Sequence, residues 1–280
     1  MNVIEQVMLG WQCLRYASRQ LLSPALWAPW LMVGGVEALA LAALWWFAHP
    51  WVSWLMAPLL TSAAGEGVLR YPNLFRVLPG LFARVDLVVQ ASLGALAAGV
   101  ATALFAVRSA DRTASPGAAW RQAGRSVLRL VLVNLPLTLI AVGLSYGLDL
   151  ALQARGSSSS SRHLAHGMSL GLIFVVQAWF LYANALVMLG GYGWLGALAA
   201  LPRLAARGMA GALFMAVLTL VPLLLVQGLT ATVASLVDRG VPETVGWLVA
   251  VQLVVTLVSS FLLTGGAAVY YQSALTEEST

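Results

Sequence analysis

Charged residues are scarce in this chain. Only 9% of its 280 residues are charged and 60% are hydrophobic, whereas an ordinary soluble domain carries roughly 25% charged residues. All fifteen basic residues are Arg and none is Lys, a bias to which we attach no mechanistic meaning. The shortage of charge excludes water as the main solvent and predicts an integral membrane protein.

The chain also lacks the residues of common metal and catalytic sites. Its single cysteine, Cys13, cannot form an internal disulfide and has no nearby His or Cys to complete a metal site. His49, His163 and His166 fall at helix ends or in loops, so none is placed to hold a haem or pigment within the membrane. The P-loop, zinc-protease and serine-hydrolase signatures are all missing. We therefore expect no metal, no cofactor and no enzymatic activity.

Long apolar runs replace what is missing. Several reach the roughly 20 residues that an α-helix needs to cross a hydrocarbon core about 30 Å thick. Segments of alternating apolar and polar residues, which would indicate a transmembrane β-barrel, do not occur. The sequence thus predicts an all-α polytopic membrane helix bundle with about six transmembrane helices, at about Ala25–Ala48, Leu87–Val107, Leu130–Gln153, Met168–Leu189, Met209–Val233 and Val245–Tyr271.

The connections between these spans differ in character. Residues 50–84 mix aromatics, prolines and isolated arginines, and this composition predicts an extracytoplasmic segment that lies along the membrane surface. Residues 154–166 contain the serine run Ser157–Ser161, which predicts a flexible loop. The second span is rich in Ala and Gly, so we expect it to be central and closely packed against its neighbours.

A five-residue pattern, Arg-x-Ala-small-Arg, occurs three times. Two arginines four residues apart share one face of a helix, and an apolar face beside them is typical of an amphipathic helix on a membrane surface. Each copy precedes a span, so residues 1–280 divide into three repeats of one surface helix and two spans, at 1–108, 109–190 and 191–280. The arginines of the three copies are Arg15 and Arg19, Arg121 and Arg125, and Arg203 and Arg207.

Two spans separate successive copies, so all three copies lie on one side of the membrane. With the N-terminus inside, nine arginines are cytoplasmic and six are outside, an excess that follows the positive-inside rule. We therefore expect a multi-pass protein of a bacterial inner membrane with both termini in the cytoplasm.

The arginine helices have two possible roles. Their guanidinium groups can anchor the protein to the phosphates of anionic lipid head groups. Alternatively, three similar basic helices form a docking platform for a cytoplasmic protein partner. The net charge of +5 fits contact with anionic lipid, and we expect no nucleic acid binding.

Isolated polar residues lie within the predicted spans. Glu37 is near the middle of the first, where an ionisable group costs about 2.5–3.5 kcal/mol. It is either a proton or cation site or a protonated group hydrogen-bonded to another helix. The amides either hold helices together or line a substrate path at which Pro136 and Pro222 break their helices. The complete set is Glu37, Asn134, Gln177, Asn184, Gln227 and Gln252.

The three arginine helices and the spans that follow them resemble, in layout, a group of bacterial six-span proteins. These are the YciC-like families and the membrane domain found beside glycerophosphodiester phosphodiesterases. The resemblance carries over no catalytic residue and implies a membrane module. The leading hypothesis is a non-enzymatic subunit, acting as scaffold or membrane component of a larger, possibly transport, assembly. The alternatives are an autonomous small-molecule or ion transporter that uses Glu37, and a lipid-modifying membrane enzyme.

Overall fold

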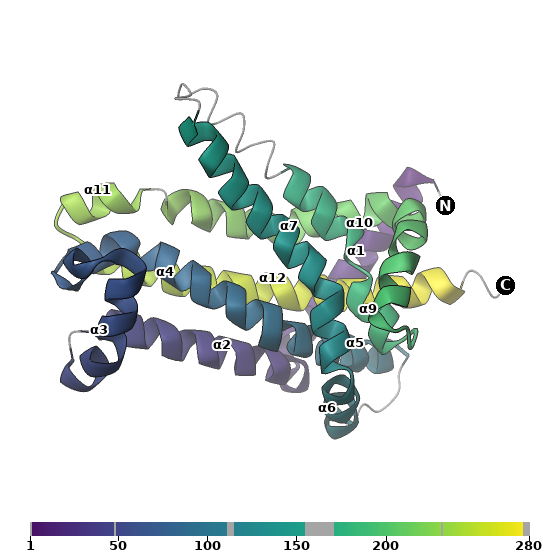
Figure 1. Ribbon diagram of the computed structural model, residues 1–280. Helices are drawn as coiled ribbons and strands as arrows, with labels where there is room; N and C mark the ends of the chain where they lie inside the picture. Colours follow the sequence, from purple (N-terminus) through teal and green to yellow (C-terminus); the bar gives the residue numbers. More distant parts are fainter. Residues whose placement is uncertain (1, 48, 111–114, 155–170, 231, 277–280) are drawn as a thin grey trace. The chain divides into compact units, whose positions relative to one another are not determined.

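The computed structural model describes residues 2–47, 49–110, 115–154, 171–230 and 232–276, and these ranges contain helices and connecting turns but no strand (Figure 1). The predicted loop at 154–166, with Ser157–Ser161, His163 and His166, lies almost wholly outside these ranges. The α-helices are α1 (Val3–Arg19), α2 (Pro24–Trp45), α3 (Pro50–Ala64), α4 (Asn73–Val89), α5 (Ala95–Ser109), α6 (Pro116–Arg125), α7 (Val127–Ala154), residues 171–179, α9 (Ala183–Met188), α10 (Trp194–Thr230), α11 (Val233–Asp238) and α12 (Glu243–Thr276).

Six helical segments of the described chain are long and apolar enough to cross a membrane, which confirms the all-α polytopic fold. They are Pro24–Trp45, Asn73–Ser109, Val127–Leu144, Gly171–Met188, Trp194–Thr230 and Glu243–Ser273. Two of them have 37 residues, well above the roughly 20 residues that a helix needs to cross the hydrocarbon core. Because the hydrocarbon core is only about 30 Å thick, both helices extend beyond it.

The helix that contains the second span begins before the predicted start of that span. α4 starts at Asn73 and continues through a π-helical turn, Gln90–Gly94, into α5. Residues 73–84, which we assigned to a surface segment, therefore belong to the same helical run as the second span. Its buried residues Leu74, Leu78, Leu81 and Phe82 recur at helical spacing and give this part an apolar face to pack.

Neither proline in the candidate substrate path breaks its helix. α7 contains Pro136 in its interior, and α10 continues past Pro222. The non-helical residue of α10 is instead Gly208, with φ −128° and ψ 17°. This kink separates residues 194–207, which include the third arginine copy, from the fifth span predicted to start at about Met209.

The chain forms two compact units. The first comprises Met1–Pro29, Ala95–Thr219 and Phe261–Thr280, and the second comprises Trp30–Gly94 and Leu220–Ser260. The division passes through α2, through the junction of the π turn with α5, and through α10 and α12. The boundaries of the two units do not coincide with those of the three sequence repeats, which stay a prediction.

Aromatic rings and small residues form the core of the first unit. Phe261 of α12 stacks on Trp27 at 4.6 Å between ring centroids and meets Phe105 of α5 edge to face at 5.2 Å. The small residues of α5 are buried, from Ala95 to Ala106, and Gly99 leaves room for Leu130 of α7. Their burial confirms that the second span is closely packed.

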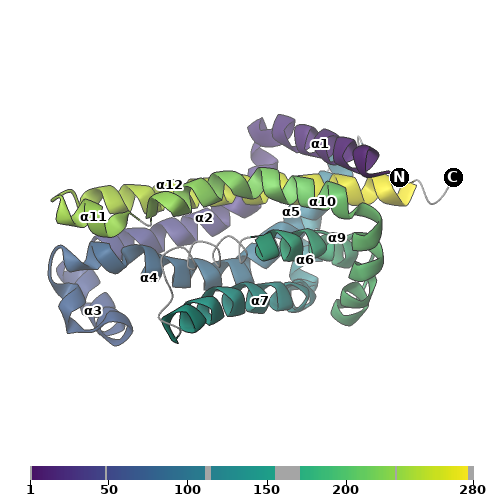
Figure 2. The same cartoon turned by 90° about the horizontal axis from the view of Figure 1, so that it is seen from above.

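Helix α1 packs against α10 and α12 within the first unit (Figure 2). A Cβ on Gly10 would lie 3.1 Å from the Gly211 carbonyl oxygen, and a Cβ on Gly266 would lie 3.1 Å from Leu14. The Ala210 amide donates a 3.1 Å hydrogen bond to Oε1 of Gln6. α1 is thus fixed by both shape and a polar contact.

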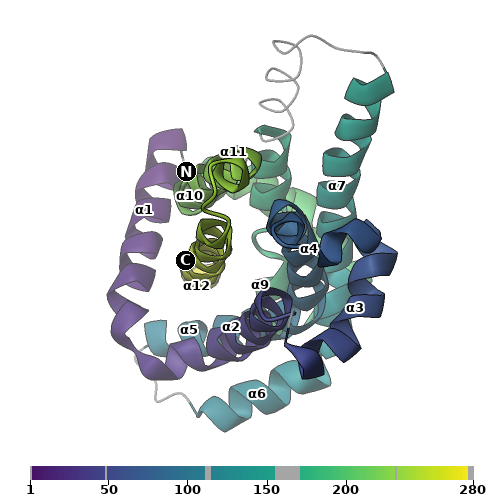
Figure 3. The same cartoon turned by 90° about the vertical axis from the view of Figure 1, so that its left-hand side faces the viewer.

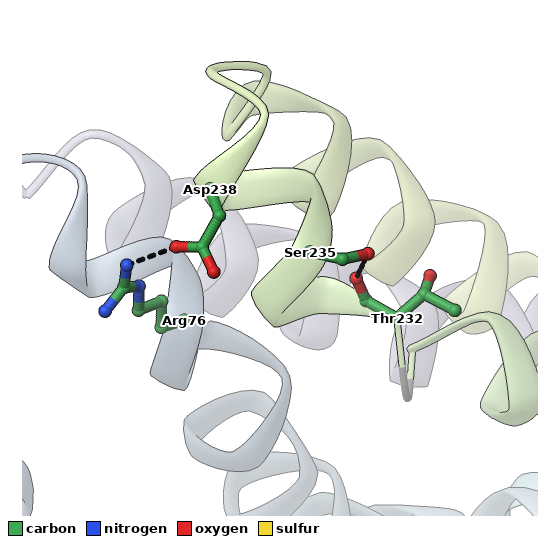
Figure 4. A network of polar contacts seen from close by, with 4 residues as sticks. All are labelled: Arg76, Thr232, Ser235 and Asp238. Carbon is green, nitrogen blue, oxygen red and sulfur yellow. Dashed lines mark hydrogen bonds and ion pairs between the residues drawn. The ribbon is translucent and has the colours of Figure 1, made fainter.

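Polar contacts at the ends of helices connect α4 with α11 and α12 in the second unit, which Figure 3 views end-on. Arg76 of α4 forms an ion pair with Asp238 of α11 (Figure 4). The Tyr71 hydroxyl, just before α4, donates a 2.8 Å hydrogen bond to Glu243 at the start of α12. Trp45 and Trp247 meet edge to face at 5.7 Å, so aromatic residues add to this packing.

Candidate functional site

All three arginine copies are helical and belong to the first compact unit. The first is in α1, which begins with a capping box between Asn2 and Glu5. The second is in α6, which starts at Pro116 with Ser115 in the N-cap position. The Ser115 side chain makes no capping hydrogen bond.

The three copies share one pattern of burial. The central alanine is buried in each, with Ala17 and Ala123 0% exposed and Ala205 1% exposed. The flanking arginines are exposed in all three, namely Arg15, Arg19, Arg121, Arg125, Arg203 and Arg207. Each copy therefore packs through its alanine and turns its positive charge outward.

Two of the six polar residues predicted within the spans pair with each other. Asn134 of α7 donates from Nδ2 to Oδ1 of Asn184 in α9 at 2.8 Å, and also to the Leu130 carbonyl oxygen at 2.8 Å. An amide that holds two helices together in this way fits the structural alternative for these residues.

The other amides are divided between the two units. Gln177 belongs to the first unit, whereas Gln227 and Gln252 belong to the second together with Glu37. Gln227 is exposed, and Gln177 and Gln252 are half-buried. Among the described residues, no hydrogen bond joins these three side chains to one another, so the substrate path stays a prediction.

Glu37 lies at the centre of a polar cluster in the second unit. Its side chain is only 1% exposed, and its Oε1 accepts a 2.9 Å hydrogen bond from Nε2 of Gln90. Asp86 approaches both Glu37 and Gln90 closely enough to interact with them. Glu37 of α2 is thus hydrogen-bonded to another helical segment, as one of its two interpretations predicts.

The second carboxyl oxygen of Glu37 differs from the first. Oε2 is buried and has no hydrogen-bond partner among the described residues. A buried polar atom without a partner costs free energy. The cluster therefore has an unused acceptor, or a place for a proton, next to Asp86.

Asp86 and Gln90 were not among the predicted site residues. Sequence reasoning put them near the end of a span because it started that span at Leu87. In a helix that starts at Asn73 they lie well inside, and their spacing of four places them on one face. An acidic residue and an amide four apart, facing an intramembrane Glu, are the signal that could have identified them.

The π turn gives Gln90 its place. It begins at Gln90 and ends at Gly94, and a Cβ on Gly94 would lie 2.5 Å from Oε1 of Gln90. A side chain at this position would displace the folded carboxamide of Gln90. Isolated π turns of this kind occur frequently at functional sites.

Cys13 is a packing residue. Its side chain is 2% exposed, and burial raises the pKa of the thiol to about 12. The neutral thiol is a poor nucleophile and a poor metal ligand. No group of three or more His, Cys, Asp or Glu in the described ranges is arranged to hold a metal.

Comparison of the chain with protein-family models, with curated proteins and with solved structures finds no match.

Proposed function

We propose that this protein is a non-enzymatic membrane subunit, a scaffold or the membrane component of a larger transport assembly. The observation that carries the proposal is the shared burial pattern of the three arginine copies, with buried alanines and exposed arginines in one compact unit. Exposed guanidinium groups at helix surfaces bind phosphate and carboxylate groups well. Anionic lipid head groups and an acidic face of a cytoplasmic protein are the partners that this charge fits.

We further propose that both termini and the three arginine copies face the cytoplasm of a bacterial inner membrane. The arginine count supports this orientation. Fusion of alkaline phosphatase to the C-terminus tests it, because this reporter is active only on the outer side. Activity of the C-terminal fusion would contradict the orientation.

The subunit role predicts recovery in a complex. We expect the full chain, extracted in a mild detergent at native expression level, to run as a stoichiometric assembly whose mass exceeds that of its detergent-solubilised monomer. Substitution of all six motif arginines by glutamine should release the partner. The matched control replaces Arg70, Arg84 and Arg239, which are exposed and predicted to lie on the opposite side. Recovery of the wild-type chain as a lone monomer would overturn the proposal.

The second candidate is an autonomous transporter that uses Glu37. The unpartnered Oε2 atom favours it, because ionisable groups buried in a membrane commonly mark ion pathways. Proteoliposomes that contain the purified chain should transport the ion or small molecule across their membrane. This flux should be lost in Glu37→Gln and kept in Glu66→Gln, a substitution of an exposed carboxylate. Unchanged flux in Glu37→Gln would exclude this role.

A further inference from the structure

The Glu37 cluster contains two carboxyl groups that meet inside one compact unit. Glu37 comes from α2, and Asp86 comes from α4, one helical turn before Gln90. Glu37 is buried, with an exposed fraction of 1%. Two interacting carboxylates repel each other when both are charged, and burial of Glu37 removes a charge there from water. A single proton shared by the pair removes both penalties.

The geometry supplies a place for that proton. Oε1 of Glu37 is occupied by the Gln90 donor at 2.9 Å, while Oε2 has no partner in the described chain. The amide donor satisfies Oε1, which leaves Oε2 as the carboxyl oxygen without a contact and as the position for a hydroxyl proton. The proton then belongs on Oε2, from which it can be donated to Asp86.

The surroundings leave no other charge to neutralise the pair. Asp86 is the titratable group that acts on Glu37 from α4. On α2, one turn before Glu37, Gly34 lies against the apolar Leu257 of α12. Within the described ranges, no arginine interacts with Glu37 or Asp86. Charge balance in the cluster therefore depends on protons.

We propose that Glu37 and Asp86 form a proton-exchange site in which one proton is held on Glu37 Oε2 and donated to Asp86. Gln90 is a positioning residue, fixed by the π turn and by the space at Gly94. Release breaks the O–H bond and transfers the proton to water, which becomes hydronium, and leaves the pair with one additional negative charge. Rebinding reverses the step, so that the pair couples protonation to the arrangement of α2 and α4.

Infrared difference spectroscopy of the full chain in lipid nanodiscs tests this site directly. A pH step should change the carbonyl band of a protonated carboxyl, and this band should shift in D₂O. Glu37→Gln should abolish the change and Asp86→Asn should alter its midpoint, whereas Glu66→Gln should reproduce the wild-type spectrum. Equal difference spectra in wild type and Glu37→Gln would overturn the proposal, as would a carboxyl band that no pH change affects.

A second variant covers the case in which loss of a carboxyl prevents folding. Gln90→Leu keeps both carboxyls but removes the donor on Oε1, so the proton is no longer confined to Oε2 and the titration midpoint should move. An unchanged midpoint would contradict the positioning role. A band that responds to added NaCl at constant pH would show a metal cation site and overturn the proton assignment.

The proton site and the subunit role can each fail without the other. A lone monomer that shows the titrating band would lose the subunit role and keep the proton site. A stable complex without the band would keep the subunit role and lose the proton site.

Discussion

Gly211 of α10 lies directly against Gln6 of α1, and a Cβ at this glycine would be 2.6 Å from the Gln6 backbone oxygen and 2.7 Å from the Tyr270 ring. Neither neighbour can move aside freely, because one is backbone and the other belongs to a ring that is 2% exposed. The absence of a side chain at residue 211 is therefore a condition for the packing of α1.

Gly211→Ala should destabilise the first unit. Overpacking of a close contact costs about 1–3 kcal/mol, and we expect a loss of this size in reversible unfolding in detergent. Gly228→Ala in the same helix is the control, because its Cβ would meet nothing within 4 Å. That substitution should be neutral or stabilise by about 0.5–1 kcal/mol. Equal stability of the two variants would contradict the close approach of α1.

The Asn134–Asn184 pair should contribute a modest coupling between α7 and α9. Interhelical hydrogen bonds in membranes average about 0.6 kcal/mol and reach about 1.7 kcal/mol. A double-mutant cycle with Asn134→Leu and Asn184→Leu measures the coupling free energy. We expect a value in this range, and strictly additive effects would mean that the 2.8 Å contact does not stabilise the fold.

Cys13 should resist thiol reagents in the folded protein. Burial raises its pKa from an ordinary 9.0 to about 12, so the thiol is protonated and inaccessible at neutral pH. Maleimide labelling should be slow until the protein is denatured. Ser18→Cys in a Cys13→Ser background, with the new thiol at an exposed position of the same helix, should be labelled rapidly. Equal rates would contradict the burial of Cys13.

The same shift has a consequence for stability. Because the folded state holds the thiol proton more tightly, the contribution of Cys13 is complete below pH 9.0 and is lost as the pH rises toward about 12. The free energy of unfolding of wild type should fall over this interval by more than that of Cys13→Ser.

The Arg76–Asp238 ion pair should contribute little to stability. The two side chains are 51% and 61% exposed, and exposed pairs contribute about 0–1 kcal/mol. Asp238→Asn should therefore lower the free energy of unfolding by less than about 1 kcal/mol. Phe75→Ala, which removes a neighbouring side chain of 5% exposure, should cost about 3–5 kcal/mol. A larger effect of Asp238→Asn would show that the pair is stronger than its exposure indicates.

Helix boundaries show where sequence reasoning succeeds and where it stops. The first and sixth spans were predicted within a few residues because their apolar runs end at His49 and at the acidic tail, and composition changes sharply there. The helix of the second span begins at Asn73, well before the predicted start of that span at Leu87, because Arg76, Pro79 and Arg84 reduce the hydropathy of α4. Tertiary packing of Leu74, Leu78 and Phe82 keeps that segment helical.

The candidate site was likewise predicted only in part. Glu37 was identified because a carboxyl in an apolar run is costly wherever it points. Its partners Asp86 and Gln90 could not be assigned because they come from another helical segment. Gln90 is 53 residues from Glu37 in the sequence. Apolar patterning alone does not specify which helices face each other.

Composition and apolar run length are local properties, and by themselves they determined that the protein is an all-α membrane bundle with six spans. The arginine pattern is local too, and the sequence placed its copies on helices. Which small residues permit close contacts, such as Gly211 beside Gln6 and Gly99 beside Leu130, depends on segments that meet only after folding. The tertiary structure decided those contacts, and with them the pairing of Glu37, because side-chain packing between distant helices selects the partner of a buried carboxyl.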